Sequence, residues 1–158
     1  MDTEALDPTD RLIAERACER LVLEFVHALD LGEPAEVAEL FTEDGVWEWA
    51  WDDRRFQGRE ALRAYFGSRP ADRLSRRLCT NILVTLTSAS TATATTYFTT
   101  YRVDGHTDGG YMPPQIPTQV GHYEDAFRKV DGRWLLSRRS LFLSFAGPTE
   151  RLAPADPS

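Results

Sequence analysis

Apolar residues recur at helical spacing in the first part of this 158-residue chain, and further on they alternate with polar residues. A row of apolar residues four positions apart predicts a long amphipathic first helix. The row consists of Ile13, Ala17, Leu21, Phe25 and Leu29. Asp7-Pro8 is a typical helix start and Gly32 a typical stop, so we expect this helix to end near Leu31. Two shorter helices are predicted from Glu33-Pro34 and over residues 58–67, with a turn over residues 42–45.

Residues 46–51 contain three of the four tryptophans. In a β-strand the side chains point to opposite faces with period two, so Trp47, Trp49 and Trp51 are expected on one face. Each indole carries an N–H that needs a partner, which suits the wall of a ligand pocket. An ordinary core strand of an antiparallel sheet has the same alternation, and both interpretations stay open.

Four later segments are rich in β-branched and aromatic residues and predict strands joined mainly by hairpin turns. They cover residues 77–87, 91–103, 119–130 and 133–145. Helices followed by hairpins predict an α+β fold: a curved antiparallel sheet wrapped around three N-terminal helices, cone-shaped with an internal pocket. We expect one domain over residues 1–146 and a disordered, proline-rich tail over residues 147–158.

The net charge of −7 argues against nucleic acid as a partner, because phosphate binding needs a basic surface. A local basic run is interpreted as a solvated segment that offsets acidic neighbours, in preference to an anion site. It consists of Arg69, Arg73, Arg76 and Arg77. Cys18 and Cys79 are too few for a disulfide framework, and no segment predicts a signal peptide or a membrane span. These features predict a cytoplasmic protein with no membrane partner.

No cofactor and no metal are predicted. His27, His106 and His122 never stand four residues from one another with a carboxylate between them. The chain has neither a glycine-rich phosphate loop nor a G-x-S-x-G motif. Among enzymes, cofactor-independent acid–base chemistry is the class that remains.

Several short strings, taken in order, resemble SnoaL-like proteins. Those of the helical half are FVHALDLGE (25–33), LFTEDG (40–45) and FQGREAL (56–62). Those of the sheet half are TN (80–81), GHYED (121–125) and DGRW (131–134). The resemblance implies the cone fold of the nuclear transport factor 2-like superfamily, which is usually dimeric. That superfamily includes polyketide cyclases, scytalone dehydratase, ketosteroid isomerase, limonene epoxide hydrolase and small subunits of ring-hydroxylating dioxygenases, so the fold alone does not decide the function.

The resemblance places Asp30 where these proteins carry a pocket aspartate at the end of the first helix. A carboxylate in an aromatic pocket suits general acid–base catalysis, although a plain helix-end aspartate is the alternative. Arg77 stands where the relatives commonly carry histidine, and arginine does not accept a proton near neutral pH. We expect Arg77 and Asn81 to hold an enolate or a carboxylate, with Arg77 paired to Asp30 or Asp125. An internal salt bridge is the alternative.

On the strand over residues 119–130, Tyr123, Asp125 and Phe127 share one face, which the resemblance places inside the cone. Asp125 then corresponds to the pocket acid of ketosteroid isomerase. The other two site residues of that enzyme align with Phe25 and Trp49, so steroid isomerisation is not carried over. Tyr97 and Tyr101 are expected to be hydroxyl donors or core aromatics.

The leading hypothesis is a cyclase, dehydratase or isomerase that acts without a cofactor on an aromatic or polycyclic polyketide-like molecule. From the resemblance we also expect a homodimer. Its catalytic candidates are Asp30, Arg77, Tyr123 and Asp125. Its substrate-binding candidates are Phe25, Trp47, Trp49, Trp51, Asn81, Tyr97, Tyr101 and Phe127. The alternatives are a non-catalytic ligand-binding or assembly subunit, like those of ring-hydroxylating dioxygenases, and an epoxide hydrolase.

Overall fold

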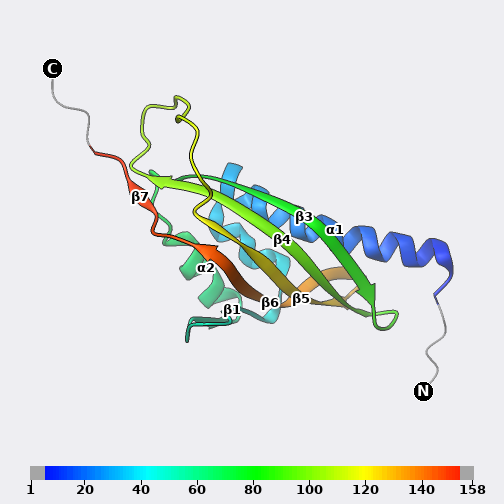
Figure 1. The fold of residues 1–158 in the computed structure, drawn as a ribbon. Helices are drawn as coiled ribbons and strands as arrows, with labels where there is room; N and C mark the ends of the chain where they lie inside the picture. Colours follow the sequence, from blue (N-terminus) through cyan, green and yellow to red (C-terminus); the bar gives the residue numbers. More distant parts are fainter. Residues whose placement is uncertain (1–5, 154–158) are drawn as a thin grey trace.

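A computed structural model describes residues 6–153 and shows a strongly curved sheet that partly encloses the helices (Figure 1). The helices are α1 (Pro8–Leu31), the 3-10 helix η1 (Pro34–Leu40) and α2 (Arg59–Gly67). The strands are β1 (Phe41–Trp49), β2 (Arg55–Gln57), β3 (Leu74–Leu86), β4 (Thr91–Asp104), β5 (Gln119–Val130), β6 (Arg133–Ala146) and β7 (Glu150–Arg151). The α+β class, the three helices and the cone are confirmed. No helix in the described part of the chain is long and apolar enough to cross a membrane.

The strands form one sheet in the order β2-β1-β6-β5-β4-β3, with β7 beside β4. The sheet is mixed, and the prediction of a purely antiparallel sheet was wrong in this respect. β1 runs parallel to β6, and β7 runs parallel to β4. A hairpin turn forces the two strands that it joins to be antiparallel. β1 and β6 are far apart in the sequence and are not joined by a hairpin, so they can pair in parallel.

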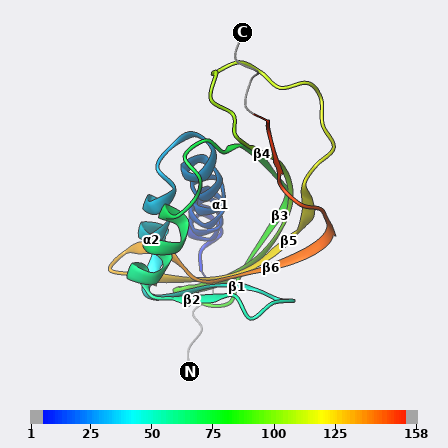
Figure 2. The ribbon, with the colours of Figure 1, turned by 90° about the vertical axis from the view of Figure 1, so that its left-hand side faces the viewer.

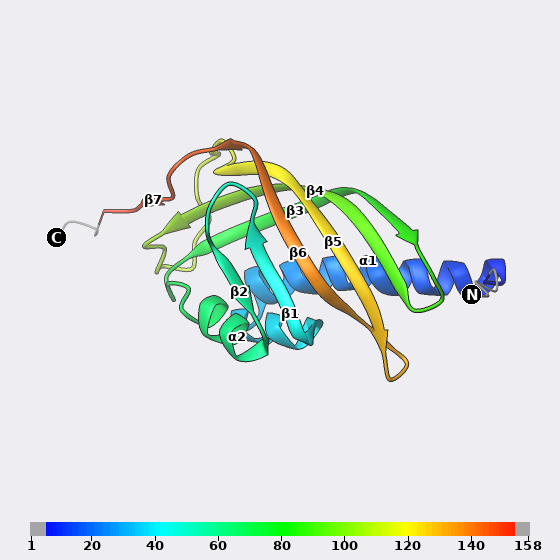
Figure 3. The ribbon, with the colours of Figure 1, turned by 90° about the horizontal axis from the view of Figure 1, so that it is seen from below.

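The helix α1 lies along the concave side of the sheet, with α2 next to β1 and β2 (Figures 2 and 3). One face of α1 is buried, and Phe25 on it is 1% exposed, but Ile13 at the start of the predicted row is 63% exposed. The Phe25 ring packs edge-on against Phe66 of α2 at 5.6 Å and against Phe41 of β1 at 6.2 Å. Burying such a side chain stabilises the fold by about 1.5–3 kcal/mol. Helices and sheet therefore share one core.

β1 begins earlier and ends earlier than predicted. Residues 42–45 lie within the strand, where the register against β6 shifts between Phe41 and Val46. Trp49 is the last residue of β1. Its backbone N–H donates to the Arg54 carbonyl across the turn that leads into β2. Trp51 therefore lies in the turn and is 74% exposed. Its predicted place on the tryptophan face was wrong, because the strand ends before it.

Part of the predicted tail pairs with the sheet as β7. β5 pairs with β4 only as far as Thr100, which leaves the last residues of β4 open for β7. The Leu152 N–H donates to the Asp104 carbonyl, and Arg151 forms an ion pair with Asp72 at 2.8 Å. These contacts join residues 150–152 to the sheet, while the division into a domain over residues 1–146 and a disordered tail stays a prediction. Residues 154–158 lie outside the described residues.

Candidate functional site

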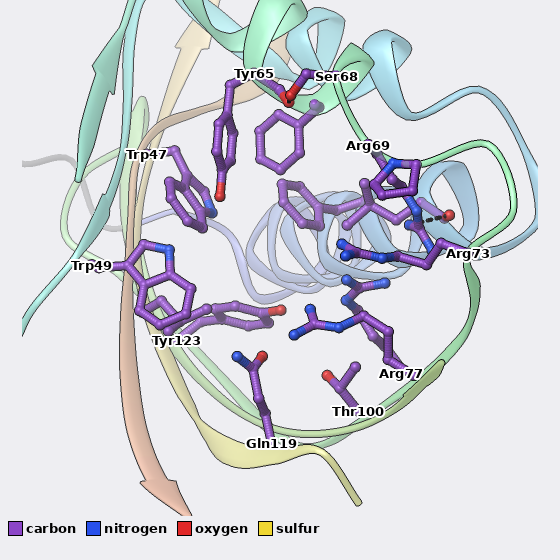
Figure 4. Close-up of a pocket in the computed structure, with 16 residues that line it drawn as sticks. Trp47, Trp49, Tyr65, Ser68, Arg69, Arg73, Arg77, Thr100, Gln119 and Tyr123 are labelled. Carbon is purple, nitrogen blue, oxygen red and sulfur yellow. Dashed lines mark hydrogen bonds between the residues drawn. The ribbon is translucent and has the colours of Figure 1, made fainter. Parts of the chain in front are cut away.

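A cavity of about 200 Å³ lies between the helices and the concave face of the sheet (Figure 4). Its lining has two chemically different sides. Aromatic rings form one side: Phe25, Trp47, Trp49, Tyr65, Phe66 and Tyr123. Guanidinium groups form the other: Arg69, Arg73, Arg77 and Arg102. Thr100 and Gln119 add polar groups.

Trp47 and Trp49 come from alternate positions of β1 and therefore face the same side of the sheet. The Trp47 ring lies 5.0 Å from the ring of Tyr65 and 5.9 Å from that of Trp49. The indole Nε1 of Trp49 is buried and has no hydrogen-bond partner among the described residues. This wall is apolar but keeps one unused donor.

Asp30, at the end of α1, is paired with Arg77 of β3. Its carboxylate accepts a hydrogen bond from the Arg77 backbone N–H at 2.6 Å and one from Arg77 Nη1 at 2.7 Å. The Ser75 hydroxyl donates a third at 2.7 Å. Both charged side chains are largely buried, and Arg77 lines the cavity whereas Asp30 lies behind it. The carboxylate thus holds the guanidinium in place.

The other arginines of the cavity differ in how their charge is balanced. Arg73 forms a two-point ion pair with Asp104, at 2.7 and 3.0 Å. Arg69 donates to the Leu29 carbonyl and to a hydroxyl, and Arg102 donates to the Thr149 hydroxyl. In the described part of the chain, neither Arg69 nor Arg102 has a carboxylate partner. Burial and the repulsion of neighbouring arginines lower the pKa of each to about 10.

The basic run of residues 69–77 was interpreted as a solvated segment, and that interpretation was wrong for three of its four arginines. Arg69, Arg73 and Arg77 line the cavity, and only Arg76 is exposed. β3 starts at Leu74, earlier than predicted, and its period of two turns Ser75 and Arg77 inward. The sequence did offer a signal for these cavity arginines: the basic run leads into a strand, and every second residue of that strand faces inward.

A third ion pair lies in the core beneath the cavity. Arg139 of β6 donates to Asp125 of β5 from Nε at 2.8 Å and from Nη2 at 2.7 Å, and both side chains are fully buried. The Arg139 guanidinium stacks 4.0 Å from the Tyr123 ring and 4.4 Å from the Phe25 ring. Sequence reasoning missed Arg139, although a buried Asp125 needs a cation and the two residues are directly paired between strands.

Tyr123 lies between this ion pair and the cavity. Burial raises its pKa to about 12, which keeps the phenol protonated at physiological pH. Its hydroxyl has no hydrogen-bond partner among the described residues and is directed toward the arginine side of the cavity (Figure 4). The Thr100 hydroxyl is buried and unpartnered as well. The site therefore offers several free donors.

Four predicted substrate-binding residues do not reach the cavity. Trp51 lies in the turn after β1. Asn81 is exposed because its φ of 53° and a register shift between Thr80 and Leu83 make a β-bulge that reverses the alternation of β3. Tyr97 and Tyr101 point outward, since β4 turns its even-numbered residues inward. Even-numbered Thr100 and Arg102 line the cavity instead.

Two further candidates are buried without lining the cavity. Asp125 is enclosed by its ion pair with Arg139, and Phe127 belongs to the hydrophobic core. Within the described residues, no group of three or more His, Cys, Asp or Glu side chains could hold a metal ion.

Comparisons with known proteins agree with this geometry. A model of the SnoaL-like domain matches residues 10–140. No curated protein sequence matches. A protein of unknown function from Mycobacterium tuberculosis has a similar structure, with 26% identity and a TM-score of 0.72 over 89% of this chain and 78% of that one.

Two other solved structures share the fold. A protein from Novosphingobium aromaticivorans assigned as a scytalone dehydratase is 23% identical, with a TM-score of 0.71 over 95% of this chain and 100% of that one. A hexachlorocyclohexane dehydrochlorinase from Novosphingobium barchaimii is 16% identical, with a TM-score of 0.69 over 94% and 100% of the two chains. The match of the family model over residues 10–140 shows that this chain belongs to the SnoaL-like family.

Proposed function

We propose that the protein is a cofactor-independent acid–base enzyme of the lyase or isomerase kind, acting on an aromatic small molecule in this cavity. The observation that carries the proposal is the neutral Tyr123 hydroxyl, which has no hydrogen-bond partner within residues 6–153 and is directed from the aromatic side toward Arg77. A substrate ring fits against the tryptophans, and a carbonyl or hydroxyl oxygen on it then faces the hydrogen-bond donors. Cyclisation, dehydration and isomerisation all build negative charge on such an oxygen.

Each polar group has a role in this reaction. Arg77, held by Asp30, stabilises the charge that develops on the substrate oxygen. Tyr123 donates a hydrogen bond or a proton to that oxygen and recovers it afterwards. Asp30 is the proposed acceptor of the carbon-bound proton once the substrate oxygen draws Arg77 away from it. It then returns this proton to a substrate carbon in an isomerisation, or to the departing hydroxyl as water in a dehydration, which regenerates the carboxylate. A histidine-centred mechanism is not part of the proposal, because arginine replaces histidine at position 77.

The size of the cavity bears on the substrate. A cavity of about 150 Å³ holds a benzene molecule in a well-studied case, so about 200 Å³ accommodates one substituted aromatic ring. In this proposal a polycyclic polyketide inserts one ring and leaves the others outside.

A second candidate is a non-catalytic ligand-binding or assembly subunit. It is favoured by the closure of Asp30 and Asp125 into separate ion pairs. No histidine or carboxylate side chain is part of the cavity lining in the described residues. Epoxide hydrolysis ranks lower, because the two aspartates do not share an arginine.

Proton exchange separates the two candidates without knowledge of the natural substrate. Acetophenone and 2-acetonaphthone are incubated with the protein in D₂O, and deuterium at the methyl carbon is followed by NMR. An enzyme is expected to exchange acetophenone faster than buffer alone, and Tyr123→Phe should slow this exchange. Arg128→Gln, which changes a surface ion pair with Asp44, is the matched control. Ligand binding without exchange would favour the non-catalytic candidate.

We also propose that the protein forms a homodimer through the outer face of the sheet. Large apolar side chains are exposed there on neighbouring strands: Leu78, Leu83, Tyr97, Tyr101 and Phe145. Next to Tyr97, His122 stacks on Phe142 with ring centroids 4.7 Å apart. Several exposed apolar side chains on one face of a sheet are typical of a protein interface.

A further inference from the structure

We propose that the ligand of this cavity is an anionic aromatic acid, whose carboxylate binds between Arg69 and Arg102 while one ring packs on Trp47 and Trp49. The inference rests on the proposed function for the choice of site and names the chemical class of substrate.

The charge of the cavity is unbalanced. Of its four arginines, Arg77 is paired with Asp30 and Arg73 with Asp104, which leaves Arg69 and Arg102 without a carboxylate in the described residues. Both guanidinium groups are partly buried, and Asp30 and Asp104 offset their charge only through space, so an anion that pairs with them directly is stabilised. The whole chain has a net charge of −7, so the positive cavity is not a consequence of overall composition.

The guanidinium geometry also favours a carboxylate. Arginine presents parallel N–H groups that match two carboxylate oxygens, which a single hydroxyl or carbonyl oxygen does not use. Repulsion between the arginines, in addition to burial, already lowers the pKa of Arg69 and Arg102, and an anion between them would relieve it. A cationic ligand would meet the same repulsion.

The unused polar groups of the cavity point in the same direction. Trp49 Nε1 can only donate, and the protonated Tyr123 hydroxyl is available to donate. The Thr100 hydroxyl, on a residue that is 1% exposed, is also unpartnered. A carboxylate supplies only acceptors and can use several of these donors at once. An amide brings donors of its own, for which the lining side chains in the described part of the chain offer only hydroxyl oxygens and the Gln119 carbonyl.

Binding of matched probes tests the inference without turnover. Benzoate, phenylacetate and cinnamate are each compared with their primary amide, and benzylamine serves as the cation, by titration calorimetry and tryptophan fluorescence. We expect at least one acid to bind about tenfold or more tightly than its amide, since a buried charge pair is involved. Benzylamine should not bind. Equal binding of acid and amide, or no binding of any acid, would overturn the proposal.

Variants assign the effect to the cavity. Arg102→Gln should weaken binding of the acid by about tenfold or more and bring the acid-to-amide ratio toward one. Thr100→Val keeps the side-chain shape and removes the Thr100 hydroxyl. It should weaken binding of the acid without loss of folding. Arg128→Gln removes the same charge from the surface and should leave the ratio unchanged. An unchanged ratio in Arg102→Gln, with folding verified by circular dichroism, contradicts the proposed position of the carboxylate.

The outcomes separate the ligand class from the enzyme proposal. Acid-selective binding without proton exchange supports the ligand class and contradicts the enzyme. Proton exchange of the ketones together with equal binding of acids and amides supports the enzyme and contradicts the ligand class.

Discussion

Asp30 and Arg77 are 47 residues apart in the chain, yet the Asp30 carboxylate accepts hydrogen bonds from both the backbone and the side chain of Arg77. The backbone contact ties the end of α1 to β3, and the side-chain contact aims the guanidinium into the cavity. The Asp30 carboxylate therefore joins α1 to β3 and also orients the Arg77 guanidinium in the cavity.

Asp30→Asn should lower the rate of proton exchange by about 10²–10⁴-fold if Asp30 accepts the proton. Asn keeps the size of the side chain but cannot take up the proton or balance Arg77. The rate is measured by NMR as above, together with its pH dependence. Asp44→Asn, which removes a carboxylate from an exposed ion pair, is the matched control. A rate within a few-fold of the parent would remove Asp30 from the mechanism.

Tyr123 should make the stability of the protein sensitive to alkaline pH. Its folded-state pKa of about 12 lies above the usual value of 10, so the folded protein keeps a proton that the unfolded chain loses. The stabilisation is complete below pH 10 and declines as the pH rises toward 12. The free energy of unfolding of the parent should therefore fall more steeply than that of Tyr123→Phe, by up to about 1.4 kcal/mol per pH unit. The free energy of unfolding of both proteins is measured by urea titration at pH 9, 10 and 11. An equal decrease with pH in the parent and in Tyr123→Phe would contradict this.

The buried pair of Arg139 and Asp125 should be costly to break from one side. Arg139→Met leaves a buried carboxylate without its cation and should reduce the free energy of unfolding by about 3–5 kcal/mol. Adding Asp125→Leu removes the orphaned charge and should restore much of the loss. Arg138→Met, beside it on β6 but half exposed, should cost less than about 1 kcal/mol. Urea denaturation gives the free energy of unfolding of all three variants. A double variant that is less stable than Arg139→Met alone would refute this account.

Tyr97→Glu should dissociate the proposed homodimer, because it places a charge at the centre of the outer sheet face. Light scattering coupled to size-exclusion chromatography reports the mass directly. Leu12→Glu is the matched control, since Leu12 is also an exposed apolar residue but lies on α1. A parent protein that is already a monomer of 17.9 kDa excludes the interface.

Local periodicity in the sequence was enough to predict much of the fold. The four-residue apolar spacing of α1 and the alternation in β1 and β5 show which side of each element is buried, because side-chain direction follows from backbone geometry alone. Phe25, Trp47, Trp49 and Tyr123 are therefore predictable cavity residues, and the structure places all four in the lining.

The remaining features depend on which elements meet, and only the tertiary structure decides that. A bulge at Asn81 reverses the alternation of β3, and the end of β1 moves Trp51 into a turn. The pairing of Asp125 with Arg139 follows from the register between β5 and β6. Arg69, Arg73 and Arg102 come from a loop and a distant strand, so their shared positive cavity arises only when the sheet curls around α1. Periodicity acts over a few residues, whereas charge balance and cavity size are set by segments far apart in the chain.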